Sequence, residues 1–141
     1  MSDWSLLEEG REARIVFSAE LAETAAVAEA LVQFLKRHNC PIDYFAFKLV
    51  TQEILVNAVV HGNKNDASKK VKVYVGFNEF RLAIEIMDEG TEKNKDQTTS
   101  ANKTFTEGGR GFQLMQLYGY YVDILNGGSG FILTKRLGEK I

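Results

Sequence analysis

The sequence predicts a two-layer α+β fold in which a mixed β-sheet is covered on one face by helices. Several segments alternate apolar and polar residues, a pattern typical of half-buried strands. The segment 19–38 instead repeats its apolar residues at spacings of three and four, which indicates an amphipathic helix. Because strands and helices do not alternate strictly along the chain, we expect a mixed or mostly antiparallel sheet.

The predicted elements follow the order β-α-α-β-β-lid-α-β-β. Ser18 is a suitable N-cap for the first helix, and Pro41, the only proline, stops that helix. A turn at Asn78 joins the two central strands. The strands are expected over 11–18, 71–77, 81–87, 120–126 and 130–137, and the helices over 19–38, 43–61 and 112–118.

Length and composition set the broad class. The 141 residues suit a single domain spanning 1–141, and 45% hydrophobic residues suffice for a core. A net charge of -2 argues against direct nucleic-acid binding. Cys40 is the only cysteine, which excludes an internal disulfide and a multi-cysteine zinc site. The sequence has neither a signal peptide nor an apolar run long enough for a membrane span, so we expect a soluble cytoplasmic protein.

One segment differs from the rest in composition. Residues 91–107 are dominated by Thr, Lys, Asn, Asp, Gln and Ser, with Phe105 as the only large apolar side chain. A polar loop of this length inside a compact domain is typical of an active-site lid or of a disordered segment. We predict a lid over about 91–107.

The helix predicted over 43–61 carries the first candidate site. Glu53, Asn57 and His61 recur every four residues and are therefore expected to share one helical face. An amide oxygen is a suitable ligand for Mg²⁺, and a carboxylate one turn away can accept a proton from a hydroxyl. The same spacing also fits an ordinary polar border of a helix.

Two glycine-containing turns complete the candidate site. Asp88 and Gly90 follow a predicted strand, where the carboxylate can accept a hydrogen bond from an exocyclic amine and the glycine allows close approach. The run Gly109-Arg110-Gly111-Phe112 opens a helix, where free amides and a guanidinium suit a phosphate. The alternatives are a simple turn and a flexible hinge. The second run matches neither the P-loop nor the Rossmann pattern.

Together, the three elements resemble the GHKL ATPases, the family of gyrase, Hsp90, histidine kinases and MutL. Glu53-x-x-x-Asn57-Ala-x-x-His61-Gly62 resembles the N box of that family. Asp88-x-Gly90 resembles its first glycine box, and Gly109-x-Gly111-Phe112 its second. The resemblance covers roughly residues 11–137. It implies a Bergerat-type ATP-binding fold, with ATP and Mg²⁺ as cofactors.

Within the family, the short chain looks most like the anti-sigma-factor serine/threonine kinases of the RsbW and SpoIIAB type. This resemblance implies Asn57 as the Mg²⁺ ligand and Glu53 as general base. His61, Asp88, Gly90, Gly109, Arg110, Gly111, Phe112 and Ser129 are then expected to bind ATP. The implied partners are a sigma factor and a STAS-domain anti-anti-sigma protein, and a homodimer is also expected.

The sequence departs from this group in one informative place. An arginine commonly precedes the second glycine box, whereas Glu107 stands near that position here. Arg110 is a candidate replacement. The departure keeps open a non-catalytic, nucleotide-sensing switch that only binds partners. A detached histidine kinase catalytic domain is a third alternative, disfavoured because no helical hairpin with a phosphoacceptor histidine is recognisable and His38 falls inside the first predicted helix.

Overall fold

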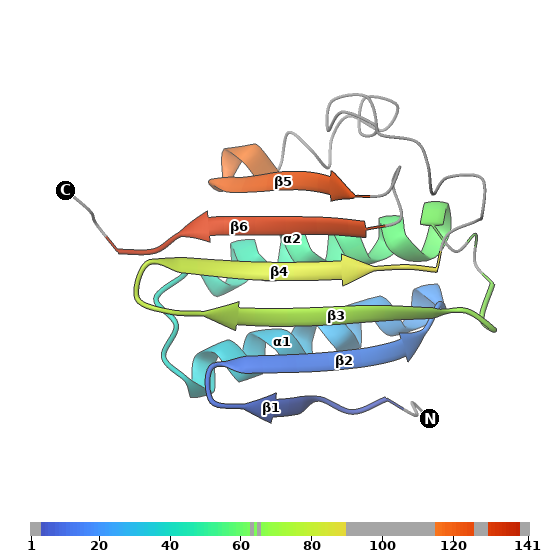
Figure 1. The fold of residues 1–141 in the computed structure, drawn as a ribbon, viewed down its shortest axis with the longest axis horizontal. Coiled ribbons are helices and arrows are strands. Elements are labelled where there is room, and N and C mark those ends of the chain that lie inside the picture. The colour runs from blue at the N-terminus through green and yellow to red at the C-terminus, as the bar shows by residue number, and fades with distance from the viewer. Residues whose placement is uncertain (1–3, 63, 65, 90–114, 126–129, 139–141) are drawn as a thin grey trace.

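The computed structural model describes residues 4–62, 64, 66–89, 115–125 and 130–138. In this part of the chain, a six-stranded sheet forms one layer and the helices α1 and α2 form the other. In Figure 1, α1 and α2 both lie behind the sheet, so they cover one of its faces, and the other face points toward the viewer. The predicted α+β class, with helices on one face of a sheet, is confirmed.

The sheet is antiparallel throughout its described strands. Its order is β1-β2-β3-β4-β6-β5, and each neighbouring pair is antiparallel. Four of the five neighbouring pairs join strands that are consecutive in chain order, and β4 with β6 is the exception. The strands are β1 (Leu7–Glu9), β2 (Glu12–Ser18), β3 (Lys70–Phe77), β4 (Arg81–Met87), β5 (Tyr120–Leu125) and β6 (Gly130–Arg136). The antiparallel form of the expected sheet is therefore the one observed.

Alternation along the strands builds the core between the layers. In β2, Ala13, Ile15 and Phe17 are buried, whereas the residues between them face the other side of the sheet. The strand register aligns these inward positions with those of β3, β4 and β6. Phe34 of α1 and Phe47 of α2 pack against them and are fully buried. This packing holds the two helices on one face.

The start of the first helix differs from the prediction. Ser18 is not its N-cap but the last residue of β2, and its hydroxyl accepts a hydrogen bond from Lys70 Nζ at 3.0 Å. The strand pairing continues one step further, because the Ala19 amide donates to the Lys69 carbonyl. Glu20 is still extended, so helical structure begins only with η1 (Leu21–Glu23) and α1 (Thr24–Arg37). Continued pairing with β3 therefore overrides the local capping preference.

The link between the helices follows the sequence closely. Asn39 adopts a left-handed conformation (φ 57°), which commonly terminates helices, and Pro41 follows. The second helix, α2 (Tyr44–Asn57), begins after Asp43, whose side chain accepts a hydrogen bond from the Ala46 amide at 3.1 Å. This N-cap satisfies one of the free amides at the helix start.

The four strands predicted after residue 70 correspond to β3, β4, β5 and β6, and their described ends agree with the structure to within a residue. The turn at Asn78 is confirmed, because its side-chain oxygen accepts hydrogen bonds from the Phe80 and Arg81 amides at 2.8 and 2.9 Å. Of the helix predicted over 112–118, the described part is helical at 115–117. The lid predicted over 91–107 lies outside the described residues.

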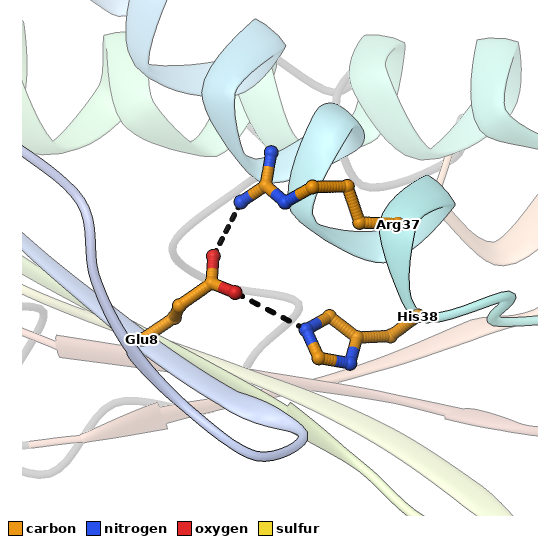
Figure 2. A network of polar contacts seen from close by, with 3 residues as sticks. All are labelled: Glu8, Arg37 and His38. Atoms are coloured by element: carbon orange, nitrogen blue, oxygen red, sulfur yellow. Dashed lines mark hydrogen bonds and ion pairs between the residues drawn. The ribbon is translucent and has the colours of Figure 1, made fainter.

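The sequence analysis assigned no element before residue 11, yet β1 lies there. All three β1 residues are exposed, so no burial pattern marks the strand in the sequence. Glu8 joins β1 to the end of α1, where it pairs with Arg37 and, at 3.3 Å, with His38 Nε2 (Figure 2). These hydrogen bonds, that of Arg37 foremost, hold the pKa of Glu8 below its ordinary value.

Candidate functional site

Glu53 and Asn57 lie one turn apart near the C-terminal end of α2. Both side chains are half-buried, between the helix surface packed on the sheet and the solvent. Four residues of α-helix rise about 6 Å, so the carboxylate and the amide point in similar directions, one above the other. The structure therefore places a carboxylate and an amide one helical turn apart, as the spacing predicted.

The helix changes its geometry directly after Asn57. Residues Ala58–Gly62 form a π-helical segment, η2, whose hydrogen bonds span five residues instead of four. His61 lies in this segment and is exposed, whereas Glu53 and Asn57 are half-buried. Its expected place on the same face as these two residues stays a prediction. Its expected contact with ATP stays a prediction. Single π turns occur often at functional sites, and this one begins beside the candidate ligand.

Asp88 provides the sheet-side part of the site. It directly follows β4 and continues the inward alternation of Ile84 and Ile86, so it lies on the helix-covered side. With 8% exposure, it is the one acidic residue classed as buried in the described part of the chain. Taking a carboxylate out of water costs several kcal/mol unless polar groups compensate, so packing alone is a poor reason for its burial. We therefore keep Asp88 as a candidate ligand-binding residue.

Hydrogen bonds of Lys70 with Glu89 and Ser18 connect the strand ends next to Asp88. These three residues were not predicted as part of the site. The Lys70 amide donates a hydrogen bond to Glu89 Oε2 at 2.8 Å, which joins the start of β3 to the end of β4. Lys70 Nζ in turn donates to Ser18 on β2. These contacts fix the backbone next to Asp88. No local pattern signals them, because the partners lie 19 and 52 positions apart in the chain.

The two halves of the site lie at the same end of the molecule. In Figure 1, α2 and β4 run in the same direction, and both end at the right of the view. Asn57 is the last residue of α2, and Asp88 is the first after β4. A ligand at this end can therefore meet an amide from the helix layer and a carboxylate from the sheet layer.

Six of the predicted ATP-binding residues lie outside the described residues. They belong to the first glycine turn, the second glycine run and the loop before β6: Gly90, Gly109, Arg110, Gly111, Phe112 and Ser129. The phosphate cradle and its helix N-terminus therefore remain predictions from the sequence.

The described residues contribute little to a metal site on their own. They contain no cluster of three or more His, Cys, Asp or Glu side chains that could hold a metal ion. Mg²⁺ in nucleotide sites typically keeps several waters and takes only one or two protein ligands, with the rest from phosphates. The half-buried Asn57 amide fits this pattern, since a magnesium nucleotide needs only one such oxygen.

Cys40 does not belong to the site. It is buried between α1 and α2, and burial raises the pKa of its thiol to about 11. The nucleophilic thiolate is therefore scarce at neutral pH. Cys40 fills space in the core.

Comparison with known families agrees with this geometry. The profile of the histidine kinase-like ATPase domain family matches residues 17–137, which includes α2, β4 and every predicted site residue. The chain therefore belongs to the histidine kinase-like ATPase family. This membership supports ATP as the nucleotide. No curated protein matches the sequence at a significant level. Among the described residues, no helix has the length and apolar character required to cross a membrane.

Proposed function

We propose that this chain is an ATP-dependent protein serine/threonine kinase that also acts as an anti-sigma factor in the cytoplasm. Its phosphoacceptor is a serine or threonine on a STAS-domain antagonist, and its second partner is a sigma factor. The observation that carries the proposal is the position of Glu53 and Asn57, one turn apart on α2. They lie at the end of the molecule where the buried Asp88 follows β4. Membership of an ATPase family supports ATP as the phosphoryl donor.

Three of the described site residues have one task each in this proposal. The Asp88 carboxylate accepts a hydrogen bond from the exocyclic amine of adenine. The Asn57 amide oxygen holds Mg²⁺, which when bound neutralises charge on the phosphates. Glu53, one turn before Asn57, accepts the proton of the substrate hydroxyl.

The transfer itself balances as follows. The hydroxyl oxygen of the acceptor serine or threonine forms a bond to the γ-phosphorus of ATP. The bond from that phosphorus to the oxygen bridging the β- and γ-phosphates breaks, and ADP leaves with the electron pair. Glu53 takes the hydroxyl proton. The protein contributes mainly positioning and charge stabilisation, as is usual for phosphoryl transfer.

A second function is favoured by one observation. Glu107 stands near the sequence position where the best-known kinases of this group commonly carry an arginine that touches the terminal phosphate. A negative charge there opposes transfer more than it opposes nucleotide binding. The alternative is a switch that senses ATP and binds its partners without phosphorylating them.

A transfer assay distinguishes the two functions. The protein is incubated with γ-labelled Mg-ATP and a STAS-domain protein that has an acceptor serine, as wild type, Glu53→Gln and Asn57→Ala. Gln52→Ala is the matched control, because this neighbour is also half-buried but lies on another side of α2. The kinase proposal expects labelled acceptor with wild type and Gln52→Ala, and at least about a 100-fold loss in both site variants.

The remaining outcomes are equally informative. Saturable ATP binding without labelled acceptor overturns the kinase proposal and supports the switch. A Glu53→Gln variant with unchanged transfer contradicts the role of Glu53 as general base. Absence of ATP binding contradicts both functions.

A further inference from the structure

The sheet ends in two edge strands that differ in length and protection. Among the described strands, β1 has only β2 as a neighbour and β5 has only β6. An edge strand exposes unpaired amides and carbonyls to which another chain can add, so proteins usually shorten, charge or cover their edges. β1 follows this rule, because it has only three residues and Glu8 joins it to the end of α1.

β5 has few of these protections. Its six residues are Tyr-Tyr-Val-Asp-Ile-Leu, and both tyrosines, the valine and the isoleucine are types that favour strands. Each β5 residue faces one residue of β6, so no bulge interrupts the pairing. The strand has no proline, and Asp123 is its only charge. β5 is therefore a long and regular edge that suits the addition of another strand.

Half of the β5 backbone faces away from β6. In an antiparallel pair, every second residue directs its amide and its carbonyl toward the neighbouring strand, and the residues between them direct theirs to the opposite side. Within the described ranges of the chain, the β5 backbone bonds only to β6. The opposite side of β5 therefore presents a row of alternating donors and acceptors, which an extended chain matches.

A groove lies along β5. It has a volume of about 360 Å³ and is lined by Gln116, Gly119 and the four β5 residues from Tyr120 to Asp123. This volume lies within the usual range of ligand-binding clefts. In Figure 1, the helical turn at 115–117 lies on the side of β5 that points away from β6. Gly119 adopts a left-handed conformation (φ 85°), which allows the chain to turn between this helix and β5.

The side chains of β5 define which segment fits. Val122 and Ile124 point to the covered side of the sheet and border the core, whereas Tyr121 and Asp123 are exposed on the other side. Asp123 forms no ion pair with a described residue, and its neighbour on β6 is Ile132. Since adjacent strands favour apolar pairs and pairs of opposite charge, the segment should carry apolar residues on one side and a cation on the other.

We propose that β5 binds an extended segment of a partner protein, which adds to the sheet as a further antiparallel strand. Alternate apolar residues of this segment extend the core next to Val122 and Ile124, and a lysine or arginine between them pairs with Asp123. Backbone hydrogen bonds provide affinity in such additions, and the alternate side chains provide specificity. A second copy of β5 fits less well, because β5 has no basic residue to meet Asp123.

A peptide with the sequence of β3, Lys70–Phe77, is a suitable probe because it alternates valine with lysine and tyrosine. Calorimetric titration of the full chain should show saturable binding of one peptide per chain. Asp123→Lys should weaken this binding about 5- to 10-fold, since a cation then faces the lysines of the peptide. A second peptide, with glutamate in place of both lysines, should instead prefer Asp123→Lys over wild type.

Glu9→Lys is the matched control. It makes the same charge change at an exposed residue of β1, the opposite edge of the sheet, and should bind both peptides as wild type does. Circular dichroism verifies that both variants are folded. Equal binding of each peptide by wild type and Asp123→Lys overturns the proposal, as does the absence of saturable binding up to about 1 mM peptide.

Two N-methylated peptides test whether the probe binds as a strand. One is methylated at the amides of its three valines, and the other at those of Lys72, Tyr74 and Gly76. An added strand pairs through only one of its edges, so one peptide should bind at least about 10-fold more weakly and the other should bind normally. If both peptides keep or both lose their binding, strand addition is wrong.

Hydrogen exchange locates the added strand on β5. In the chain alone, every second β5 amide should exchange rapidly, because it has no strand partner. The β3 peptide should slow the exchange of these amides and leave that of β1 unchanged. If all β5 amides are already protected before the peptide is added, or if the peptide protects other strands instead, the proposal is overturned.

Discussion

The two faces of the sheet are built from alternate residues of the same strands, yet they differ in almost every property. The covered face is apolar and sealed by α1 and α2, with Ile15, Ile84 and Leu133 all at most 1% exposed. The uncovered face carries charges, aromatic rings and two glycines beneath flat side chains. The covered face explains why the chain folds. The uncovered face is not sealed by the described helices, so charged side chains there keep access to water.

Asp88 is the informative exception to this contrast. It lies on the covered side, where every neighbouring inward position of β4 is apolar, and it lies where the strand ends. A buried carboxylate needs compensating polar groups, and a ligand can supply some of them, which is why we connect Asp88 with ligand binding. The following four predictions test the contrast and its exception, in order of decreasing effect.

The contrast between the faces is sharpest at two adjacent residues of β2. Ile15 is 1% exposed and Val16 is 48% exposed. Ile15→Thr removes buried apolar atoms and buries a hydroxyl, which should lower the free energy of unfolding by about 2–4 kcal/mol. Val16→Thr should change it by less than about 0.5 kcal/mol. Urea unfolding of the two variants measures both effects. Equal effects would contradict the assignment of faces.

Asp88→Asn tests the exception. Loss of the charge-assisted hydrogen bond to the adenine amine should weaken ATP binding by about 10–100-fold. Inosine triphosphate carries a carbonyl in place of that amine, and an Asn amide can donate to it. The preference for ATP over inosine triphosphate should therefore shrink or reverse, as measured by calorimetric titration. Glu89→Gln is the neighbouring control. An unchanged preference would remove Asp88 from the nucleotide site.

The Asp43 cap tests what holds the covering layer in place. Asp43→Ala removes the hydrogen bond to the Ala46 amide and should cost about 1 kcal/mol of unfolding free energy. Asp43→Ser retains a capping oxygen and should recover most of the loss. Thermal unfolding measures both variants. A loss of equal size in Asp43→Ser would argue against capping as the cause.

The smallest expected effect concerns Glu8, at the border of the covered face. Its pKa is lowered in the folded chain, so its pairing stabilises β1 above pH 4.5 and the contribution disappears as the pH falls below that value. Trp4 donates a hydrogen bond to Glu23 at 2.8 Å, and its fluorescence reports on the N-terminal segment. The acid transition in fluorescence should be smaller in Glu8→Gln. Identical acid transitions in wild type and Glu8→Gln would show that the contacts of Glu8 with Arg37 and His38 do not stabilise β1.

The sequence predicted those parts of the fold that depend on local patterns. Strand alternation identified β3 and β4, and the Asn78 turn between them followed from the side-chain chemistry of Asn. It missed β1, which is short and exposed, and it started the first helix too early at Ser18. The early helix start arises from pairing with the distant β3, which no local pattern contains. β1 pairs with its neighbour β2, and it was missed because its exposed residues show no burial pattern.

The candidate site was predictable to a similar degree. The four-residue spacing correctly placed Glu53 and Asn57 together, because α-helical geometry extends through Asn57. His61 lies beyond the α-helix, in a π segment that the sequence did not predict, because such a segment has the same residue types as an α-helix and differs only in hydrogen bonding. The burial of Asp88 required the three-dimensional structure, since a sequence of Asp followed by Glu and Gly is also typical of an exposed turn.

The central claim is that Asn57 and Asp88 belong to one ATP site that uses Mg²⁺. Calorimetric titration of the wild-type chain with ATP, in Mg²⁺ and in EDTA, tests it most directly. The account predicts saturable binding at one site per chain, at least about 10-fold tighter with Mg²⁺, and loss of that difference in Asn57→Ala. Binding that is absent, or whose dependence on Mg²⁺ survives in Asn57→Ala, would contradict it.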